Sequence, residues 1–151
     1  MFQRLGRRER GQTLIEFAFI APIIFLFLFT IVDFGLAMDR RITLQHAVRE
    51  GARYGAVHIG CDDIRDRTAA QAQSIISRDD VTVSYTDSTG TPTNPASTDD
   101  SVGVKAHFTY KPAIVNSISK VFGATALDID MSPSASARLE QTVTDAGGCG
   151  P

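Results

Sequence analysis

The side chains that most often catalyse reactions or bind metal ions are scattered in this sequence. The three histidines, His46, His58 and His107, belong to no HExxH motif and to no Cys/His cluster, so the sequence predicts no metal site. It also lacks GxSxG, GxxxxGKS/T and GxGxxG, the patterns of a serine hydrolase, a phosphate-binding loop and a dinucleotide site. We therefore expect no catalytic residue, no cofactor and no small-molecule substrate.

The two cysteines, Cys61 and Cys149, allow only one intramolecular disulfide. Neither lies in a CxxC motif, which excludes a zinc ribbon or a thioredoxin-like site. If the domain lies outside the cytoplasm, both thiols meet an oxidising environment, and the Gly-rich tail around Cys149 is flexible enough to reach back to Cys61. The alternatives are two unpaired thiols, or a bond from Cys149 to another subunit.

Glu16 requires a functional explanation because it lies at the start of a long apolar segment. Residues 14–37 read LIEFAFIAPIIFLFLFTIVDFGLA, and no charge occurs between Phe17 and Val32. About 24 residues at ~1.5 Å per residue span a hydrocarbon core, and Pro22 is tolerated in a helix that crosses a membrane. The sequence therefore predicts a membrane-inserted helix.

Three interpretations of this segment remain open. The first is a secretory signal cleaved after Gly35-Leu36-Ala37, although such signals have shorter apolar cores of ~7–15 residues. The second is an uncleaved anchor in which Glu16 reaches the lipid headgroups. The third is a prepilin-type leader, cleaved on the cytoplasmic side, so that the apolar helix stays on the mature protein.

Gly11 and Glu16 together favour the third interpretation. Cleavage after Gly11 makes Gln12 the new N-terminus, with a positive amine, and Glu16 then lies four residues along on the same helical face. A carboxylate in the first turn is also favoured by the helix dipole. It can meet the amine of a neighbouring subunit when helices stack out of register. A charge that costs about 2.5–3.5 kcal/mol at full membrane depth then becomes an assembly signal.

The sequence RGQTLIEF (10–17) and the apolar run behind it resemble the prepilin peptidase site of type IV pilins. Glycine stands before the cut, glutamate at the fifth mature position and an aromatic residue, Phe17, at the sixth. With IVDFG (31–35) and HAVREGARYGAV (46–57), the chain is similar to the TadE-like pseudopilin family of tight-adherence (Tad) pilus systems. The resemblance covers roughly residues 10–60. Flp pilins usually have tyrosine where this chain has Phe17. The tyrosine hydroxyl is therefore missing here, but the other residues of the processing site are present.

The resemblance implies a set of site residues and partners. Gly11 and Gln12 would form the processing site for a prepilin peptidase, and Glu16 and Phe17 would act in assembly. The other partners would be Tad pilins and pilus assembly proteins, and the subunit would help to initiate or tip the fibre.

Helical spacing predicts that the long helix continues beyond the membrane, from about residue 12 to 57. Its inner face is predicted from residues at helical spacing, namely Ile42, Gln45, Val48, Ala52 and Gly55. Small residues in the pairs Gly51-x-x-x-Gly55 and Ala52-x-x-x-Ala56 predict close seating of this helix against its own domain.

The rest of the chain predicts a small α+β domain with an antiparallel sheet, a pilin-like fold. The expected elements are a helix over 64–77 N-capped by Asp62-Asp63, strands over 81–85 and 102–110 around a polar loop at 87–100, a short helix from Pro112 to about Val121 that ends near Gly123, and a strand over 126–139 interrupted at Pro133.

The N-terminal residues 1–11 are basic, whereas the rest of the chain is mildly acidic. Residues 1–11 contain four arginines and one glutamate, whereas the whole chain has a net charge of −2, which gives no support for nucleic-acid binding. Four further arginines follow between residues 40 and 53, so the positive-inside count is close to a tie. We expect a cytoplasmic N-terminus because its arginines are denser and because Gly11 must face a cytoplasmic-side peptidase.

These expectations combine into one organisation and one leading function. The predicted parts are a cytoplasmic leader over 1–11, a transmembrane helix over 12–37, an extracytoplasmic α+β domain over 38–143 and a flexible tail over 144–151. The leading hypothesis is a minor pilin or pseudopilin of an adhesive Tad-type pilus. Its expected location is the inner or cytoplasmic membrane of a bacterium or archaeon, in contact with lipid. The alternatives are a membrane-tethered extracytoplasmic ligand-binding module and, third, an anchored enzyme.

Overall fold

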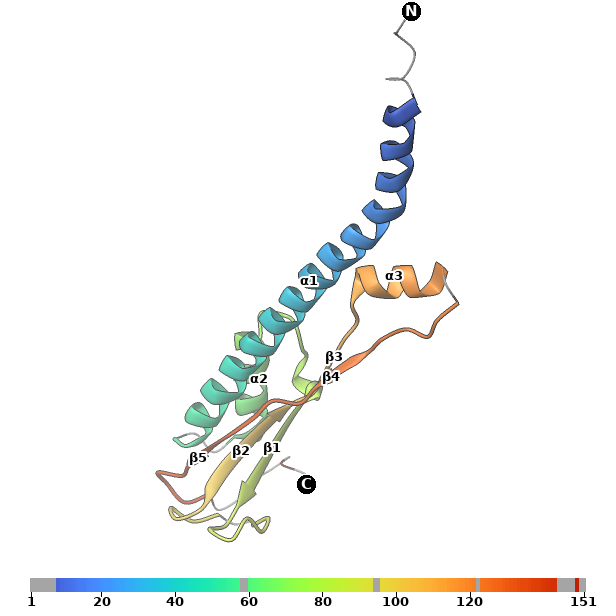
Figure 1. Ribbon diagram of the computed structural model, residues 1–151. Coiled ribbons are helices and arrows are strands. Elements are labelled where there is room, and N and C mark those ends of the chain that lie inside the picture. The colour runs from blue at the N-terminus through green and yellow to red at the C-terminus, as the bar shows by residue number, and fades with distance from the viewer. Residues whose placement is uncertain (1–7, 58–59, 94–95, 122, 144–148, 150–151) are drawn as a thin grey trace, which may run out of the picture. The chain divides into compact units, whose positions relative to one another are not determined.

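The computed structural model describes residues 8–57, 60–93, 96–121, 123–143 and 149, with the backbone alone at 8–11 and 121. The chain forms two compact units, the first of Met1–Leu36 with Pro112–Leu127 and the second of Ala37–Lys111 with Asp128–Pro151. A long apolar N-terminal helix and a small antiparallel sheet are present (Figure 1), which confirms the expected α+β, pilin-like class.

The long helix α1 spans Arg8–Gly55 and passes from the first unit into the second. It begins four residues before the expected start, so residues 8–11 at the end of the predicted leader share one helix with the apolar segment. Pro22 lies inside α1; it lacks an N–H and its ring crowds the carbonyl four residues back. The N-terminal third of α1, which contains Pro22, is bent (Figure 1).

Within the second unit, α1 packs through the small-residue face that the sequence predicted. Ala52 and Gly55 are buried, and a Cβ built on Gly51 would lie 2.0 Å from Thr68 Oγ1. The predicted inner face was wrong at Ile42, which is 57% exposed. Leu44 is fully buried instead, because the core stripe follows the 3.6-residue period back from Ala52.

The second helix, α2, spans Cys61–Gln71. The expected N-cap was wrong: Asp62 and Asp63 lie in the first turn, and Gly60 is the N-cap. Carboxylates in a first turn still interact favourably with the helix dipole. The helix also ends earlier than expected, because residues 73 and 74 adopt positive φ angles of 53° and 64°, which a right-handed helix cannot contain. The short 3-10 helix η1, Arg78–Asp80, follows.

The strands form two antiparallel sheets in the second unit. Their bounds are β1 Val81–Thr86, β2 Ser101–Ala106, β3 Phe108–Tyr110, β4 Ile129–Met131 and β5 Ser134–Arg138. The order β1-β2-β5 makes the larger sheet, and β3 pairs with β4 in the smaller one. The expected strand over 102–110 is therefore two strands separated at His107, and the expected strand over 126–139 is two strands separated around Pro133.

His107 marks the break between β2 and β3. Its N–H donates to the Asp80 carbonyl at 2.9 Å, and Ala106 N–H donates to the Pro133 carbonyl at 3.0 Å. These two bonds continue the pairing of β2 with β1 and β5 by one residue, and from Phe108 the chain pairs with β4 instead. Alternating apolar residues predict a strand but do not identify its neighbour. The core of the second unit lies between α1, α2 and the larger sheet, and contains Leu44, Val48, Ile64, Val83, Val102 and Val104.

Candidate processing and assembly site

The predicted processing residue Gly11 lies within the first turn of α1. The helix begins at Arg8, so the backbone on both sides of the expected cut is helical in the full-length chain. Glycine is ~1 kcal/mol less favourable than alanine inside a helix, and the first turn of a helix lacks intrahelical acceptors for its N–H groups. Gly11 is therefore a weak point of this helix, in the turn that frays most readily.

The next turn brings Gln12 and Glu16 together. Gln12 Nε2 donates to Glu16 Oε1 over 3.3 Å, one helical turn apart on the exposed surface. An ionised carboxylate has about four acceptor positions on its two oxygens, so this bond leaves capacity for a stronger, charged donor. Residue 12 is also the residue that cleavage after Gly11 would turn into an amino terminus.

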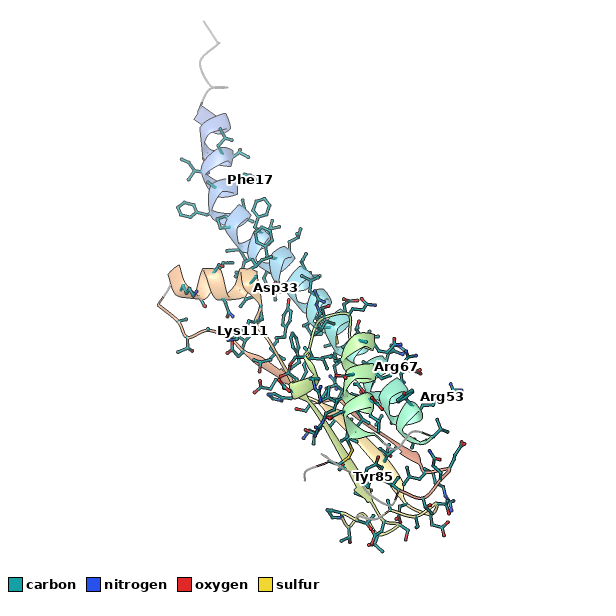
Figure 2. All side chains as sticks on the ribbon, turned by 180° about the vertical axis from the view of Figure 1, so that it is seen from behind. Phe17, Asp33, Arg53, Arg67, Tyr85 and Lys111 are labelled. Atoms are coloured by element: carbon teal, nitrogen blue, oxygen red, sulfur yellow. A yellow bond between two sulfur atoms is a disulfide. The ribbon has the colours of Figure 1, made fainter. Side chains whose placement is uncertain are left out.

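Phe17 is 63% exposed and lies near the start of a long run of exposed apolar side chains (Figure 2). The members of this run include Leu14, Ile15, Phe19, Ile20, Ile23, Ile24, Phe25, Phe27, Leu28, Ile31, Val32, Phe34 and Leu36. α1 is long and apolar enough to cross a membrane by length and composition. A surface of this size and chemistry is stable only when lipid or other apolar helices cover it.

Asp33 is the exception in this apolar run, because it is only 4% exposed. Its Oδ2 accepts hydrogen bonds from the backbone N–H groups of Ile114 at 3.2 Å and Val115 at 2.9 Å. These residues open helix α3, Ala113–Val121, which belongs to the same unit as this part of α1. Asp33 thus caps a helix that lies about 80 residues further along the chain.

The cap provides an acceptor for the free N–H groups at the start of α3 and hydrogen-bond donors for the Asp33 carboxylate. Pro112 precedes α3, and its carbonyl accepts the first helical bond, from Asn116 N–H at 3.1 Å, but a proline side chain has no oxygen to accept the next free N–H groups. Conversely, a carboxylate inside an apolar segment is costly unless it is hydrogen-bonded. Asp33 lies in the IVDFG motif, but its capping role was not predicted, because its only sign in the sequence is a charge within an apolar run.

The other end of α3 is closed as the sequence predicted. Gly123 has a positive φ of 67°, and its N–H donates to the Lys120 carbonyl at 3.2 Å. The amide of Asn116 then binds the returning chain at Leu127, accepting from its N–H at 2.7 Å and donating to its carbonyl at 3.1 Å. All of these bonds lie within the first unit.

Cys61 and Cys149 lie in the second unit and have no part in the site on α1. The structure joins them as a disulfide, with their Cα atoms 5.7 Å apart. Cys61 is buried as the first residue of α2, and Cys149 is partly buried against the same core. Residues 144–148 and 150–151, where a flexible tail was expected, lie outside the described residues.

One open hollow in the second unit bears on the ligand-binding alternative. It has a volume of about 480 Å³ and is lined by Glu50, Arg53, Tyr54, Ala56, Val57, Ala137, Arg138 and Glu140. Two of its charged side chains already have partners, because Glu50 pairs with Arg67 at 3.6 Å and Arg138 pairs with Asp99. Among the described residues, no group of three or more His, Cys, Asp or Glu side chains could hold a metal ion; His58 lies outside those residues.

Comparison with known proteins connects the first helix to one family. Residues 11–53 match the model of the TadE-like protein family. The match begins at Gly11 and includes Glu16, Asp33 and the small residues Gly51 and Ala52. It confirms the resemblance seen in the sequence and indicates a membrane-anchored, Tad pilus-associated protein. No significant match was found among curated proteins or solved structures.

Proposed function

We propose that the protein is a minor pilin or pseudopilin, a structural or assembly-initiating subunit of a Tad-type type IV pilus that acts in adhesion. The observation that carries this proposal is the family match that starts at Gly11, immediately before the Gln12–Glu16 pair and the exposed apolar run. The family is structural and not enzymatic, which agrees with a sequence that lacks catalytic motifs.

In this proposal, a prepilin peptidase cuts after Gly11 on the cytoplasmic side of the membrane. Residues 12–37 then hold the mature protein in the bilayer, and residues 38–143 lie outside the cytoplasm. This orientation agrees with the disulfide between Cys61 and Cys149, because disulfides persist in oxidising compartments.

Glu16 acts in assembly through its free acceptor positions. Cleavage gives Gln12 a positive amine, and the amine of one subunit binds the Glu16 carboxylate of the next when two apolar helices stack with a lengthwise offset. In a dry environment such a bond between two charged groups is stronger than the bond at 3.3 Å that the uncharged Gln12 amide donates to Glu16 in the full-length chain. The contact thus stabilises subunits that are stacked with the correct offset, whereas an unpaired subunit keeps a Glu16 charge without a charged partner.

Photo-crosslinking in cells that make the complete pilus system tests this role. A photoreactive phenylalanine at position 19, a residue that is 74% exposed, reports neighbours of the helix. We expect Glu16→Leu to insert in the membrane and to fold outside it, yet to lose crosslinks to other pilins. Thr13→Leu is the matched control, since it adds the same side chain one turn earlier and keeps the carboxylate. Equal crosslinking of Glu16→Leu and wild type would refute the assembly role.

A further inference from the structure

We propose that α3 and its return segment form a second membrane contact, a helix that lies in the outer headgroup layer and is held there by Asp33. The partner is the lipid surface. The inference rests on the proposed insertion of α1 in the membrane. It concerns residues 112–127, which lie entirely outside the stretch that matches the TadE-like family.

The depth of Asp33 along α1 is the first reason. Glu16 and Asp33 are 17 positions apart, about 25 Å at ~1.5 Å per helical residue. A hydrocarbon core is ~30 Å thick. With Glu16 at the inner boundary, Asp33 lies within about 5 Å of the outer boundary. Because the first turn of α3 is bonded to Asp33 at 2.9 and 3.2 Å, this turn lies at the same depth, where an interfacial helix is expected.

The composition of the segment is the second reason. Residues 112–127 read PAIVNSISKVFGATAL, and Lys120 is their only charged residue. On a helix with 3.6 residues per turn, Ile114, Val115 and Ile118 share one face, while Ser117 and Lys120 share another. The three apolar side chains remain partly exposed. Such an amphipathic helix suits a membrane surface.

The return segment extends the same surface. Leu127 is 52% exposed, and residues 124–126 before it are also exposed. Lys120 is exposed in the last turn of α3, where a long cationic side chain can bind anionic headgroups while its stem lies along the acyl boundary. The helix starts beside Asp33 and leads away from α1 (Figure 2), so lipid can reach its sides.

A tryptophan scan tests the proposal with little background, because the chain contains no tryptophan. The full-length protein is placed in bilayers that contain anionic lipid, and emission is quenched either by lipids brominated near the headgroup end of the acyl chain or by aqueous iodide. We expect Ile118→Trp to emit at shorter wavelength and to be quenched by the brominated lipid. Ser117→Trp, on the other face, and Thr82→Trp, exposed on β1, should be quenched by iodide instead.

Two further variants separate the ways in which the proposal can fail. Phe25→Trp, in the middle of the apolar run, reports insertion of α1 when the lipid is brominated near the methyl end of the acyl chain. Strong lipid quenching at position 25 with iodide quenching at position 118 overturns the α3 inference and leaves the proposed function intact. Iodide quenching at both positions overturns both. Val115→Trp repeats the measurement on the same face if Ile118→Trp does not fold.

Asp33→Leu, combined with Ile118→Trp, tests whether Asp33 holds the helix. We expect lipid quenching at position 118 to be lost in this background, and Asp33→Asn to retain part of it because one acceptor oxygen remains. Unchanged quenching in Asp33→Leu would overturn the tethering role. A blue shift at position 118 that disappears on dilution with excess lipid would overturn the lipid contact, because it would show that another protein copy covers α3.

Discussion

The close seating of α1 on α2 makes Gly51→Ala a quantitative test of the fold. The new Cβ would lie 2.0 Å from Thr68 Oγ1, whereas ordinary contacts between non-bonded heavy atoms lie at ~3.5–4.0 Å. One of the two atoms must therefore move by about 1.5 Å. Thr68 is fully buried, and its Oγ1 donates to the Ile64 carbonyl at 2.7 Å, so it has little room to move.

The expected cost follows from opposing contributions. Overpacking costs about 1–3 kcal/mol, and rotating Thr68 away would instead lose a hydrogen bond worth about 0.5–1.5 kcal/mol. The higher helix propensity of alanine offsets roughly 0.8–1.0 kcal/mol of either cost. We therefore expect Gly51→Ala to lower the free energy of unfolding by up to about 2 kcal/mol, in contrast to the gain that alanine gives at an exposed helical glycine.

A double-mutant cycle with Thr68→Ala isolates the clash. Without Oγ1, Gly51→Ala should be neutral or slightly stabilising, so the two substitutions are strongly coupled. Urea unfolding of the full-length protein in detergent micelles, followed by tyrosine fluorescence, gives the four free energies; of the three tyrosines, Tyr85 is 3% exposed in the core. The same effect of Gly51→Ala in both backgrounds would refute the packing that we derive for this helix pair.

The remaining predictions concern three local features of the chain. The Cys61–Cys149 bond spans 88 positions, and the chain-entropy model assigns such a loop about 4–5 kcal/mol; Cys149→Ala should lower stability by no more than this, and two alkylatable thiols in freshly isolated protein would contradict the bond. The Ser77 N–H and hydroxyl lower the pKa of Asp80 below 3.8, so its stabilising effect is full above that pH and is lost as the pH falls through the lowered pKa. Ser77→Ala should raise this pKa toward 3.8 in an NMR titration, and an unchanged value would exclude the hydroxyl as a cause. Gly123→Val should speed hydrogen exchange of α3 by weakening the end of the helix at φ 67°, and unchanged exchange would show that the cap is dispensable.

Much of the fold could be predicted because its strongest signals are local. The uncharged run from Phe17 to Val32 identifies the apolar helix by length and composition alone. The spacing of Gly51 and Gly55 indicated the contact face, and Gly123 indicated the end of α3, since each depends on the side-chain size of one residue. These features need no knowledge of distant segments.

The failures occur where a distant partner decides the structure. The alternation around His107 correctly indicated strands, but their division depends on distant partners, because β2 pairs with β1 and β5 whereas β3 pairs with β4. The cap that Asp33 provides for Ile114 joins positions 81 residues apart. Neither partner can be read from local periodicity, because both depend on tertiary contacts.

The N-terminus of the mature protein, isolated from cells that make the complete pilus system, tests the proposed function most directly. We predict that it begins at Gln12, and that Gly11→Val remains a full-length, membrane-bound precursor because the peptidase must approach the residue before the cut closely. Gly6→Val, in the same leader, should mature normally. A mature protein that begins at Met38 would indicate a cleaved secretory signal, and an intact Met1 would indicate a plain anchor; either result would contradict a prepilin.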